Sequence, residues 1–580
     1  ISIAGMAAQA ADVSMSSSMA VHLGRVVGTK SEIARLTDLH ARARAHCLEL
    51  CSLALECLDT SPAKAGSCSV QVLFGGAHAM QAVTLQSDLD LVALVSGLPC
   101  IPATRTESSR GRHGPRTSAS RTSRGTGKHS SSEHTNPQLD AFFSALLSEA
   151  HKQSSTLRQC RVVSGLVPLL SYARVDSDAA VEVDLSVVLL PCALPAADPF
   201  AFRATGATCL SLPLEKLDPR SQLALLSLRD AHLLLEAVPE PGRILFARAL
   251  TLLKGWARLR AVSSNVYGYL GGISWAVLLA HLFVCTSPHF SVENSSVDRV
   301  LAAFFALYAS WRFDQLPVSI YDTEWTFSKS ARGNNLEKMC ILAPSDRPRN
   351  TARNVTYSTR FALVREFERA HRLLPLYQQD QDSESTPQVA SGHSGQDESG
   401  AEGGGVALHE ADHMVGVPSP HSSATAAEGG AATRESASGP IDELFSPSGF
   451  FLRKHHRLYI SLTLTVVSAD TLPSARGYVA SRVTRLLVDV ERLHRSLLAL
   501  PFPRSFAHNG EHGARWYVAI AIRPGEEKPP AKVLDGLHTV GARFRNECEQ
   551  YFAAEQICGV QLLVGHPKPS SLAKKLGATL

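Results

Sequence analysis

Two aspartates that follow a glycine turn are the residues of this chain best suited to chemistry. Residues 74–94 read FGGAHAMQAVTLQSDLDLVAL and contain Gly75 and Gly76, then Asp88 and Asp90. Side chains two apart along a strand point to the same side of a sheet, so the two carboxylates are neighbours on one face. Their mutual repulsion favours binding of a cation such as Mg²⁺, which prefers oxygen ligands and is often coordinated by substrate phosphates as well. The plain alternative for such a pair is a solvated strand end.

A third carboxylate, Asp184, occurs in a second strand-like segment. Residues 181–190 read VEVDLSVVLL, which alternates polar and apolar residues up to Asp184 and then becomes fully apolar. This pattern is typical of a buried central strand with a polar end. If this strand pairs beside the Asp88 strand, Asp184 completes a two-metal site for in-line displacement at phosphorus. Glu182 lies on the same strand face, and an assisting role for its carboxylate in this site stays an open alternative.

The composition fits a globular enzyme with polar insertions. The 580 residues are 44% hydrophobic and 19% charged, with a net charge of +4 that does not by itself argue for nucleic acid. This length can hold about two to four domains. Twelve scattered cysteines without a CxxC pair indicate reduced thiols. We expect no secretory signal and no membrane span, because the longest apolar run, residues 273–284, is too short.

Hydrophobic periodicity predicts how these residues are positioned. In the first part we expect helices at 31–58 and 138–152 and strands at 69–74, 88–95, 161–175 and 181–190. The region from about 207 to 375 is mostly helical, with segments at 221–238, 243–260, 271–285 and 297–313. After residue 440 we expect a small α/β sandwich with strands at 457–467, 515–523 and 560–565 and helices at 475–499 and 533–553.

The helical middle carries the most specific motif. Residues 254–260 read KGWARLR and residues 264–276 read SNVYGYLGGISWA. They resemble the KxWAxxR…SNVxGFxGGxSWAxLxA segment of the nuclear-type eukaryotic poly(A) polymerases, which belong to the DNA polymerase beta-like nucleotidyltransferase superfamily. Residues 161–190, 339–344, 354–360 and 444–460 resemble further motifs of that family in the same order.

This resemblance implies an α+β multidomain fold. We expect a nucleotidyltransferase palm at 61–206, a helical nucleotide-binding middle domain at 207–377 that includes an N-terminal helical part at 20–60, and an RRM-like RNA-binding domain at 441–566. A basic Ser/Gly/Arg-rich loop at 105–134 and an acidic Gly/Ser-rich stretch at 378–440 are expected to be disordered insertions. The second contains an HExxH match at 409–413, which we do not read as a zinc site because it lacks a packed cleft.

The resemblance also implies a reaction: AMP is added from ATP to RNA 3′ ends with two Mg²⁺ or Mn²⁺ ions, and pyrophosphate leaves. Asp88, Asp90 and Asp184 match the catalytic metal ligands, and Lys254 matches the lysine that reaches the ATP phosphates. The remaining nucleotide-binding matches are Phe74, Gly75, Gly76, Asn265, Gly271, Gly272 and Ile273. Basic clusters suggest RNA contacts at Lys454, Arg457, Arg482 and Arg485, and Arg492 and Arg495 are expected on the same side of the helix as the last two. We expect a nuclear monomer whose partners are RNA 3′ ends, ATP and 3′-end processing proteins, with no membrane.

Three departures from the family pattern fall on nucleotide-binding groups. Gly76 replaces the serine of an FGS turn, Ser263 replaces a tyrosine, and residues 226–229 read LSLR where the family has NGxR. Because the metal triad is whole, we expect an active enzyme with weaker or altered nucleotide selection. The alternatives are a uridylyl- or other RNA terminal nucleotidyltransferase, and an inactive RNA-binding scaffold of 3′-end processing.

Overall fold

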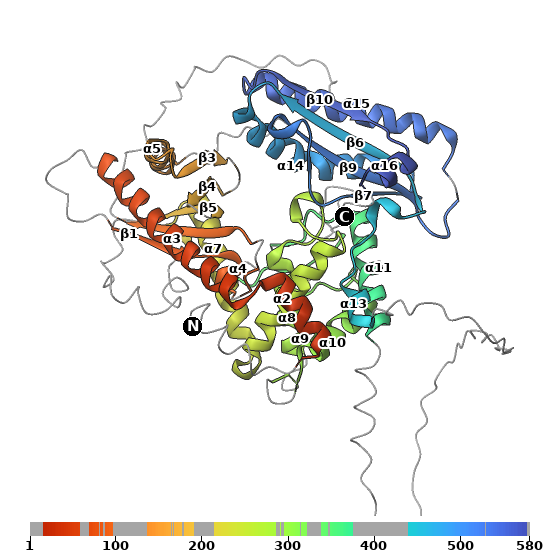
Figure 1. Ribbon diagram of the computed structural model, residues 1–580, viewed down its shortest axis with the longest axis horizontal. Helices are drawn as coiled ribbons and strands as arrows, with labels where there is room; N and C mark the ends of the chain where they lie inside the picture. Colours follow the sequence, from red (N-terminus) through yellow and green to blue (C-terminus); the bar gives the residue numbers. More distant parts are fainter. Residues whose placement is uncertain are drawn as a thin grey trace, which may run out of the picture.

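The fold is described from a computed structural model, which places residues 15–58, 69–96, 136–190, 214–321, 338–374 and 439–576, with short gaps inside these ranges. The expected basic insertion at 105–134, nearly all of the acidic one at 378–440 and its HExxH match lie outside the described residues. Figure 1 shows three folded parts, which follow one another along the chain: a sheet with its helices, a helical middle, and a C-terminal sheet with two long helices.

A five-stranded mixed sheet forms the first part. Its order is β1-β2-β5-β4-β3, and only β2 and β5 run parallel. The strands are β1 (Ser69–Phe74), β2 (Leu89–Ser96), β3 (Leu157–Val163), β4 (Leu169–Asp176) and β5 (Ala179–Leu189). The turn after β1 forms the short helix α4 (Gly76–Ala79). The predicted pairing of the Asp88 and Asp184 strands is therefore present, although the single strand expected at 161–175 is in fact two strands.

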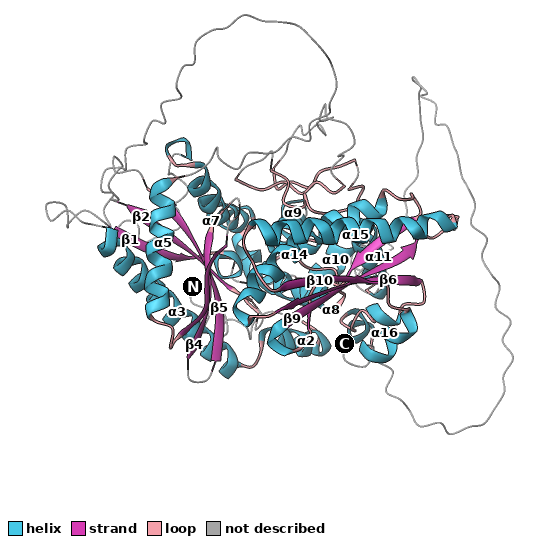
Figure 2. Cartoon of the chain, turned by 90° about the horizontal axis from the view of Figure 1, so that it is seen from above, coloured by secondary structure: helices cyan, strands magenta, loops and turns pink. Residues whose placement is uncertain are grey.

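Helices α3 (Lys30–Leu58) and α5 (Pro137–Lys152) cover one face of this sheet, as Figure 2 shows. Their apolar side chains pack with alternate strand residues such as Leu91, Val183 and Leu185. We expected residues 20–60 to belong to the middle domain. Only α2 (Ser17–Val27) packs there, against α8, while α3 packs on the sheet. Periodicity identifies a buried helix face but not the surface that covers it, which is why the assignment needed the structure.

The middle part is a helical domain built around an aromatic core. Its buried rings include Trp256, Trp275, Phe305 and Phe367, which contact one another edge-on or stacked. The helices are α7 (Pro219–Ala237), α8 (Arg243–Leu259), α9 (Gly272–Cys285), α10 (Val297–Ser310) and α11 (Tyr357–Leu373), with the 3₁₀ turns η2 (Leu214–Lys216), η3 (Glu240–Gly242) and η4 (Asn265–Tyr267). Helix α7 also packs on β5, so it connects this domain with the sheet.

The C-terminal part has β-α-β-β-α-β order, with the sheet order β10-β6-β9-β7. Its main elements are β6 (His456–Val466), α14 (Leu472–Glu491), β7 (Leu497–Pro501), β9 (Gly513–Ile522), α15 (Ala531–Ala554) and β10 (Val560–Gly565). Smaller elements are α13 (Pro440–Leu444), η6 (Phe450–Leu452), η7 (Ala469–Thr471), β8 (Phe506–Ala507), η8 (Gly510–His512) and α16 (Pro569–Leu576). The helix expected at 475–499 was wrong at its end, because residues 497–501 form a strand paired with β9. All five residues of this strand are buried, so neither helical nor strand periodicity marks them.

The described part of the chain offers no helix long and apolar enough to cross a membrane. Each of its eight cysteines is a free thiol.

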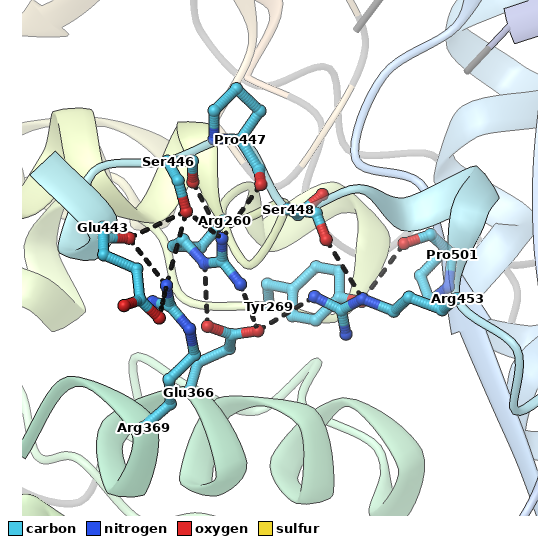
Figure 3. Close-up of polar contacts among 10 residues, drawn as sticks. All are labelled: Arg260, Tyr269, Glu366, Arg369, Glu443, Ser446, Pro447, Ser448, Arg453 and Pro501. Atoms are coloured by element: carbon cyan, nitrogen blue, oxygen red, sulfur yellow. Dashed lines mark hydrogen bonds and ion pairs between the residues drawn. The ribbon is translucent and has the colours of Figure 1, made fainter. Parts of the chain in front are cut away.

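A buried ionic network joins the middle domain to the C-terminal domain (Figure 3). The Arg260 guanidinium donates to both oxygens of Glu366, at 2.9 and 3.2 Å, and to the Ser446 and Pro447 carbonyls. Arg453, which leads into β6, donates to the same carboxylate at 2.9 Å. Burial alone would raise the pKa of Glu366, but the hydrogen bond and the two guanidinium charges outweigh burial and lower it. Glu366 therefore stays ionised and holds both arginines in place.

Replacing Glu366 should loosen this joint. We expect Glu366→Ala to lower the free energy of unfolding by about 3–5 kcal/mol, because it leaves Arg260 buried without its carboxylate and removes the partner of the half-buried Arg453. Glu368→Ala is the matched control on the same helix, since Glu368 pairs with the exposed Arg365 and should change stability by less than about 1 kcal/mol. Urea unfolding measures both, and equal effects would contradict the assignment.

Candidate active site

The strand register brings two of the predicted carboxylates together. Asp90 on β2 lies directly beside Asp184 on β5, and Asp88 immediately precedes β2. Their neighbours along each strand, Leu91 and Val183, point into the helix-covered core. The carboxylates therefore point to the opposite face of the sheet, which we call the carboxylate face.

A cavity of about 340 Å³ opens between the sheet and the middle domain. It is lined by residues of both parts, namely Gly76, Ala77, Met80, Ser87, Asp88, Asp90, Leu223, Ser227, Asp230, Ala231, Lys254, Arg258, Gly272, Ile273 and Arg349. Six of these, the two aspartates, Lys254, Gly76, Gly272 and Ile273, were predicted from the sequence. The volume suits a small ligand held by a few polar groups.

Helix α8 supplies two cations to this cavity. Lys254 and Arg258 are four residues apart, which places them on one face of the helix. The Lys254 ammonium donates to the Ala82 carbonyl at 3.2 Å, and Arg258 donates to the Thr84 hydroxyl at 2.9 Å. Both acceptors lie between α4 and β2, so these contacts fix the middle domain against the sheet at the carboxylates.

The carboxylates and the cations shift each other's pKa values. Burial, then the charges of Asp184 and Asp88, raise the pKa of Asp90 to about 6. Burial, then Glu182 and Asp184, raise the pKa of Asp88. Burial, then Arg258, lower the pKa of Lys254 to about 8, against the opposing attraction of the two aspartates. Perturbed groups gathered in one cavity are typical of a functional site.

Gly76 has to be a glycine because Asp90 occupies the space beside it. Its φ is +48°, a left-handed conformation that glycine adopts freely. A Cβ at this position would lie 1.8 Å from Asp90 Oδ2 and 2.7 Å from its Cγ. The preceding Gly75 amide donates to the Asp90 carbonyl at 2.9 Å, which holds the turn against β2. The departure from an FGS turn is thus built into the geometry of this site.

Several predicted nucleotide residues lie beside the cavity and not in its wall. Phe74 turns to the helix-covered face, where it stacks on His78 with ring centroids 4.7 Å apart. Asn265 is exposed, and its carbonyl accepts from the Asn354 amide at 3.2 Å. Gly271 is adjacent, since a Cβ there would lie 3.2 Å from the Asn265 Cβ. The Phe74 ring therefore has a packing role, and only the backbone of its turn approaches the carboxylates.

The basic residues predicted to contact RNA do not form one face. Lys454 and Arg457 are exposed at the start of β6, and Arg482 lies over the Tyr478 ring, 4.9 Å from its centroid. Three arginines expected on a single helix side are paired with carboxylates; these pairs are Arg485–Glu547, Arg492–Asp489 and Arg495–Glu526. The last two arginines follow the end of α14, so the helix is shorter and less basic than expected.

One ion pair in the cavity wall could not be predicted from the sequence. Asp230 of α7 is buried and accepts from the Ser345 amide at 3.0 Å, from the Ser345 hydroxyl at 2.6 Å and from Arg349. These partners lie more than a hundred residues apart and match no motif. Arg258 could have been found, because it follows Lys254 by one helical turn.

The donor set suits a hard divalent cation, although its carboxylates do not surround one point. Three carboxylate side chains lie on or beside two neighbouring strands, and burial, followed by mutual repulsion, raises the pKa values of Asp88 and Asp90. In the described part of the chain, no three acidic, histidine or cysteine side chains are close enough together to hold an ion. The carboxylates are therefore of the right chemical type to hold a divalent metal ion.

Comparisons with known proteins relate part of this chain to the poly(A) polymerases. Residues 245–385 match the family "Poly(A) polymerase central domain". Nuclear poly(A) polymerase 1 of Arabidopsis thaliana is 22% identical over 366 residues, covering 62% of this chain and 42% of that protein. Poly(A) polymerase PAPa of Candida albicans is 29% identical over 169 residues, covering 28% of this chain and 29% of that protein. The predicted resemblance to the nuclear poly(A) polymerases is confirmed.

The match is partial on both sides. The chain spans less than half the length of these curated relatives. A solved structure of a poly(U) polymerase aligns with a TM-score of 0.38 and 13% identity, covering 62% of this chain and 93% of that one, which is too distant to bear on the substrate.

Removing the Asp90 charge should stabilise the metal-free protein. The folded pKa of about 6 lies above the ordinary value of 3.8, so the ionised carboxyl opposes folding increasingly as the pH rises from about 4 to about 6. We expect Asp90→Asn to raise the free energy of unfolding by about 2–3 kcal/mol at pH 7.5 and to change it little at pH 4. Urea unfolding in EDTA at both pH values measures this, and a pH-independent difference would contradict it.

Substituting Gly76 should damage the site and the fold together. We expect Gly76→Ala to lower stability by about 1–2 kcal/mol, because it strains a left-handed residue and displaces the Asp90 carboxylate. Gly24→Ala is the control, since no atom lies within 4 Å of its added Cβ and its position inside α2 should make it neutral or stabilising. Thermal unfolding compares the two; a Gly76→Ala protein as stable as wild type would disprove the clash.

Proposed function

We propose that this chain is an ATP:RNA adenylyltransferase, a poly(A) polymerase that adds AMP residues to RNA 3′ ends. The observation that carries this proposal is the cavity in which Asp88, Asp90, Lys254 and Arg258 meet between the sheet and a domain matched by the "Poly(A) polymerase central domain" family. Carboxylates on one wall and cations on the other suit a triphosphate together with divalent cations.

Each side chain has a distinct role in this proposal. Asp88, Asp90 and Asp184 would hold two Mg²⁺ or Mn²⁺ ions, which supply a lowered pKa for the attacking hydroxyl and neutralise charge on the leaving group. Lys254 and Arg258 bind the β- and γ-phosphates, and Gly272 and Ile273 form the wall for the nucleobase. The RNA 3′-oxygen loses its proton and bonds to the α-phosphorus, while the bond from that phosphorus to the bridging oxygen breaks and pyrophosphate leaves.

The C-terminal domain is proposed to be an RRM-like RNA-binding module. Its β-α-β-β-α-β order and its antiparallel sheet, with four main strands and the short β8 beside β9, support this. The sheet face opposite α14 and α15 is covered by η6 and α16, where Phe450, Phe451 and Tyr459 pack with Leu572. Bases therefore have no exposed aromatic pair on which to stack there, and we expect little preference for primer sequence.

The residues of the pocket say less about which nucleotide is used than about the reaction itself. The tyrosine of the family pattern is Ser263, a half-buried residue in a short backbone bridge with Leu270. Losing a ring from the pocket weakens the case for adenine, so a uridylyl- or other nucleotidyltransferase is the rival reading. Nuclear location and recruitment by 3′-end processing proteins are proposed by analogy with the named nuclear relatives.

An extension assay tests the reaction and its substrate together. With an unstructured RNA primer, Mg²⁺ or Mn²⁺ and each nucleotide separately, we expect a ladder with ATP that exceeds those with the other three. Asp88→Ala and Asp184→Ala should abolish it, because the metal ligands act as one unit, while Glu368→Ala should leave it unchanged. Stronger extension with UTP would favour the uridylyl rival. No ladder with any nucleotide would favour an inactive scaffold, which metal-dependent ATP binding would test further.

A further inference from the structure

Four residues form an in-register row across the carboxylate face, and the row ends in an arginine. Asp90 pairs with Asp184, Asp184 with Ser171 on β4, and Ser171 with Arg161 on the edge strand β3. In-register neighbours on adjacent strands point to the same face. With strands about 4.8 Å apart, Arg161 starts roughly 10 Å from Asp184, on the side away from Lys254 and Arg258.

A β-bulge directs Arg161 to this face. Leu157 of β3 is buried in the core beneath α3 and α5, and strict alternation would place residue 161 on that same side. The register shift between Arg158 and Arg161 inserts one residue, and Gln159 takes a left-handed φ of 55°. As a result, Val162 packs on the core and Arg161 faces the carboxylates. Bulges beside active sites commonly re-aim a side chain in this way.

The Arg161 guanidinium lies within electrostatic range of a second arginine, which belongs to the C-terminal domain. Its Nη1 atom is buried and has no hydrogen-bond partner among the described residues. Arg476, on the first turns of α14, lies close enough to repel Arg161, whereas Asp184 and Glu182 attract it from within the sheet. Neither arginine forms an ion pair with a carboxylate in the described part of the chain. Two cations from separate domains that approach each other over a catalytic face call for an anionic ligand.

We propose that Arg161 and Arg476 together bind one backbone phosphate of the RNA strand, close behind its 3′-terminal nucleotide. The proposal rests on the function proposed above. Nucleotide phosphates meet Lys254 and Arg258 at the β2 side of the carboxylates, while Arg161 lies at the β3 edge on the other side. An RNA whose 3′-hydroxyl reaches Asp90 and Asp184 from that edge passes between the two arginines. A guanidinium pair suits a phosphate because its donors match the phosphate oxygens.

This subsite differs from the basic residues first considered for RNA. Arg485 and its neighbours after α14 are already neutralised by carboxylates, so they offer little charge to a phosphate backbone. Arg161 belongs to the first sheet and Arg476 to the C-terminal domain. The middle domain connects the two, since Lys254 and Arg258 contact the segment before β2 and Glu366 holds Arg453 at the entry to β6. The phosphate site therefore exists only in the assembled chain.

RNA binding by the full chain tests the proposal without turnover. The probe is a 5′-fluorescent oligoadenylate of about 15 nucleotides, followed by anisotropy at two salt concentrations in EDTA. Arg161→Gln and Arg476→Gln should each raise the Kd roughly tenfold and reduce the salt slope by about one, as loss of a phosphate contact does. The double variant should lose less than the product of the two single losses, since both side chains hold one phosphate. Arg543→Gln, on the exposed side of α15 beside Asp489, is the matched control and should change neither quantity.

A chemical version of the experiment separates contact from folding. Single methylphosphonate linkages are moved along the probe from its 3′ end. One linkage near that end should weaken binding by wild type but not by Arg161→Gln, and Arg161→Lys should restore part of the loss. Wild-type affinity of Arg161→Gln, or weak binding by this variant with no linkage-specific effect in wild type, would overturn the proposal. These readouts do not use nucleotide transfer, so failure of the extension assay would count against the proposed enzyme alone.

Discussion

The ionised carboxylate of Glu366 is the contact on which the arrangement of the domains depends. It accepts from Arg260, at the end of the helix that carries Lys254, and from Arg453, at the entry to the C-terminal sheet. Weaker contacts accompany it, such as the Trp516 indole donating to the Tyr267 hydroxyl at 3.0 Å and the Tyr269 hydroxyl donating to the Pro501 carbonyl at 3.1 Å. Buried ion pairs can often be replaced by apolar residues without loss of stability. The contribution of this network is therefore to the relative orientation of the middle and C-terminal domains.

A separate set of contacts, between the middle domain and the first sheet, makes an electrostatically unfavourable site tolerable. Three carboxylates on two neighbouring strands lie close together, and burial, followed by their mutual repulsion, raises the pKa values of Asp88 and Asp90. Helix α8 offsets part of this electrostatic cost, because it holds the positive charges of Lys254 and Arg258 opposite the carboxylates. Both cations donate hydrogen bonds to the segment before β2. The remaining imbalance is what a divalent cation and a triphosphate would relieve, because strain of this kind persists where a ligand removes it.

Much of this arrangement could be predicted from local pattern. Alternation around Asp88 and Asp184 predicted the two strands but left their pairing as a condition, and the family resemblance of the motif around Lys254 implied that its helix lies beside them. The residues 497–501 could not be identified as a strand, because a fully buried run has no period to read. The placement of α3 on the sheet, the Asp230–Arg349 pair and the bulge at Gln159 depend on partners distant in sequence, which a single sequence does not specify. Local signals therefore located the carboxylates and the cation helix, while the rest of the cavity wall depended on tertiary packing.

The departures from the family pattern are linked through the cavity. At the position of the family's asparagine, Leu226 is buried in the core, and its neighbour Ser227 takes a place in the cavity wall. One helical turn further on, Asp230 holds Arg349 at the same wall. Where the family pattern has an asparagine amide, this wall has the Asp230–Arg349 ion pair. Ser263 lacks the aromatic ring of the family's tyrosine, and the absence of a side chain at Gly76 leaves room for the Asp90 carboxylate. Under the proposed function, recognition at this wall would rely on charge and backbone groups more than on an amide or a ring stack, with the proposed metal-binding carboxylates retained.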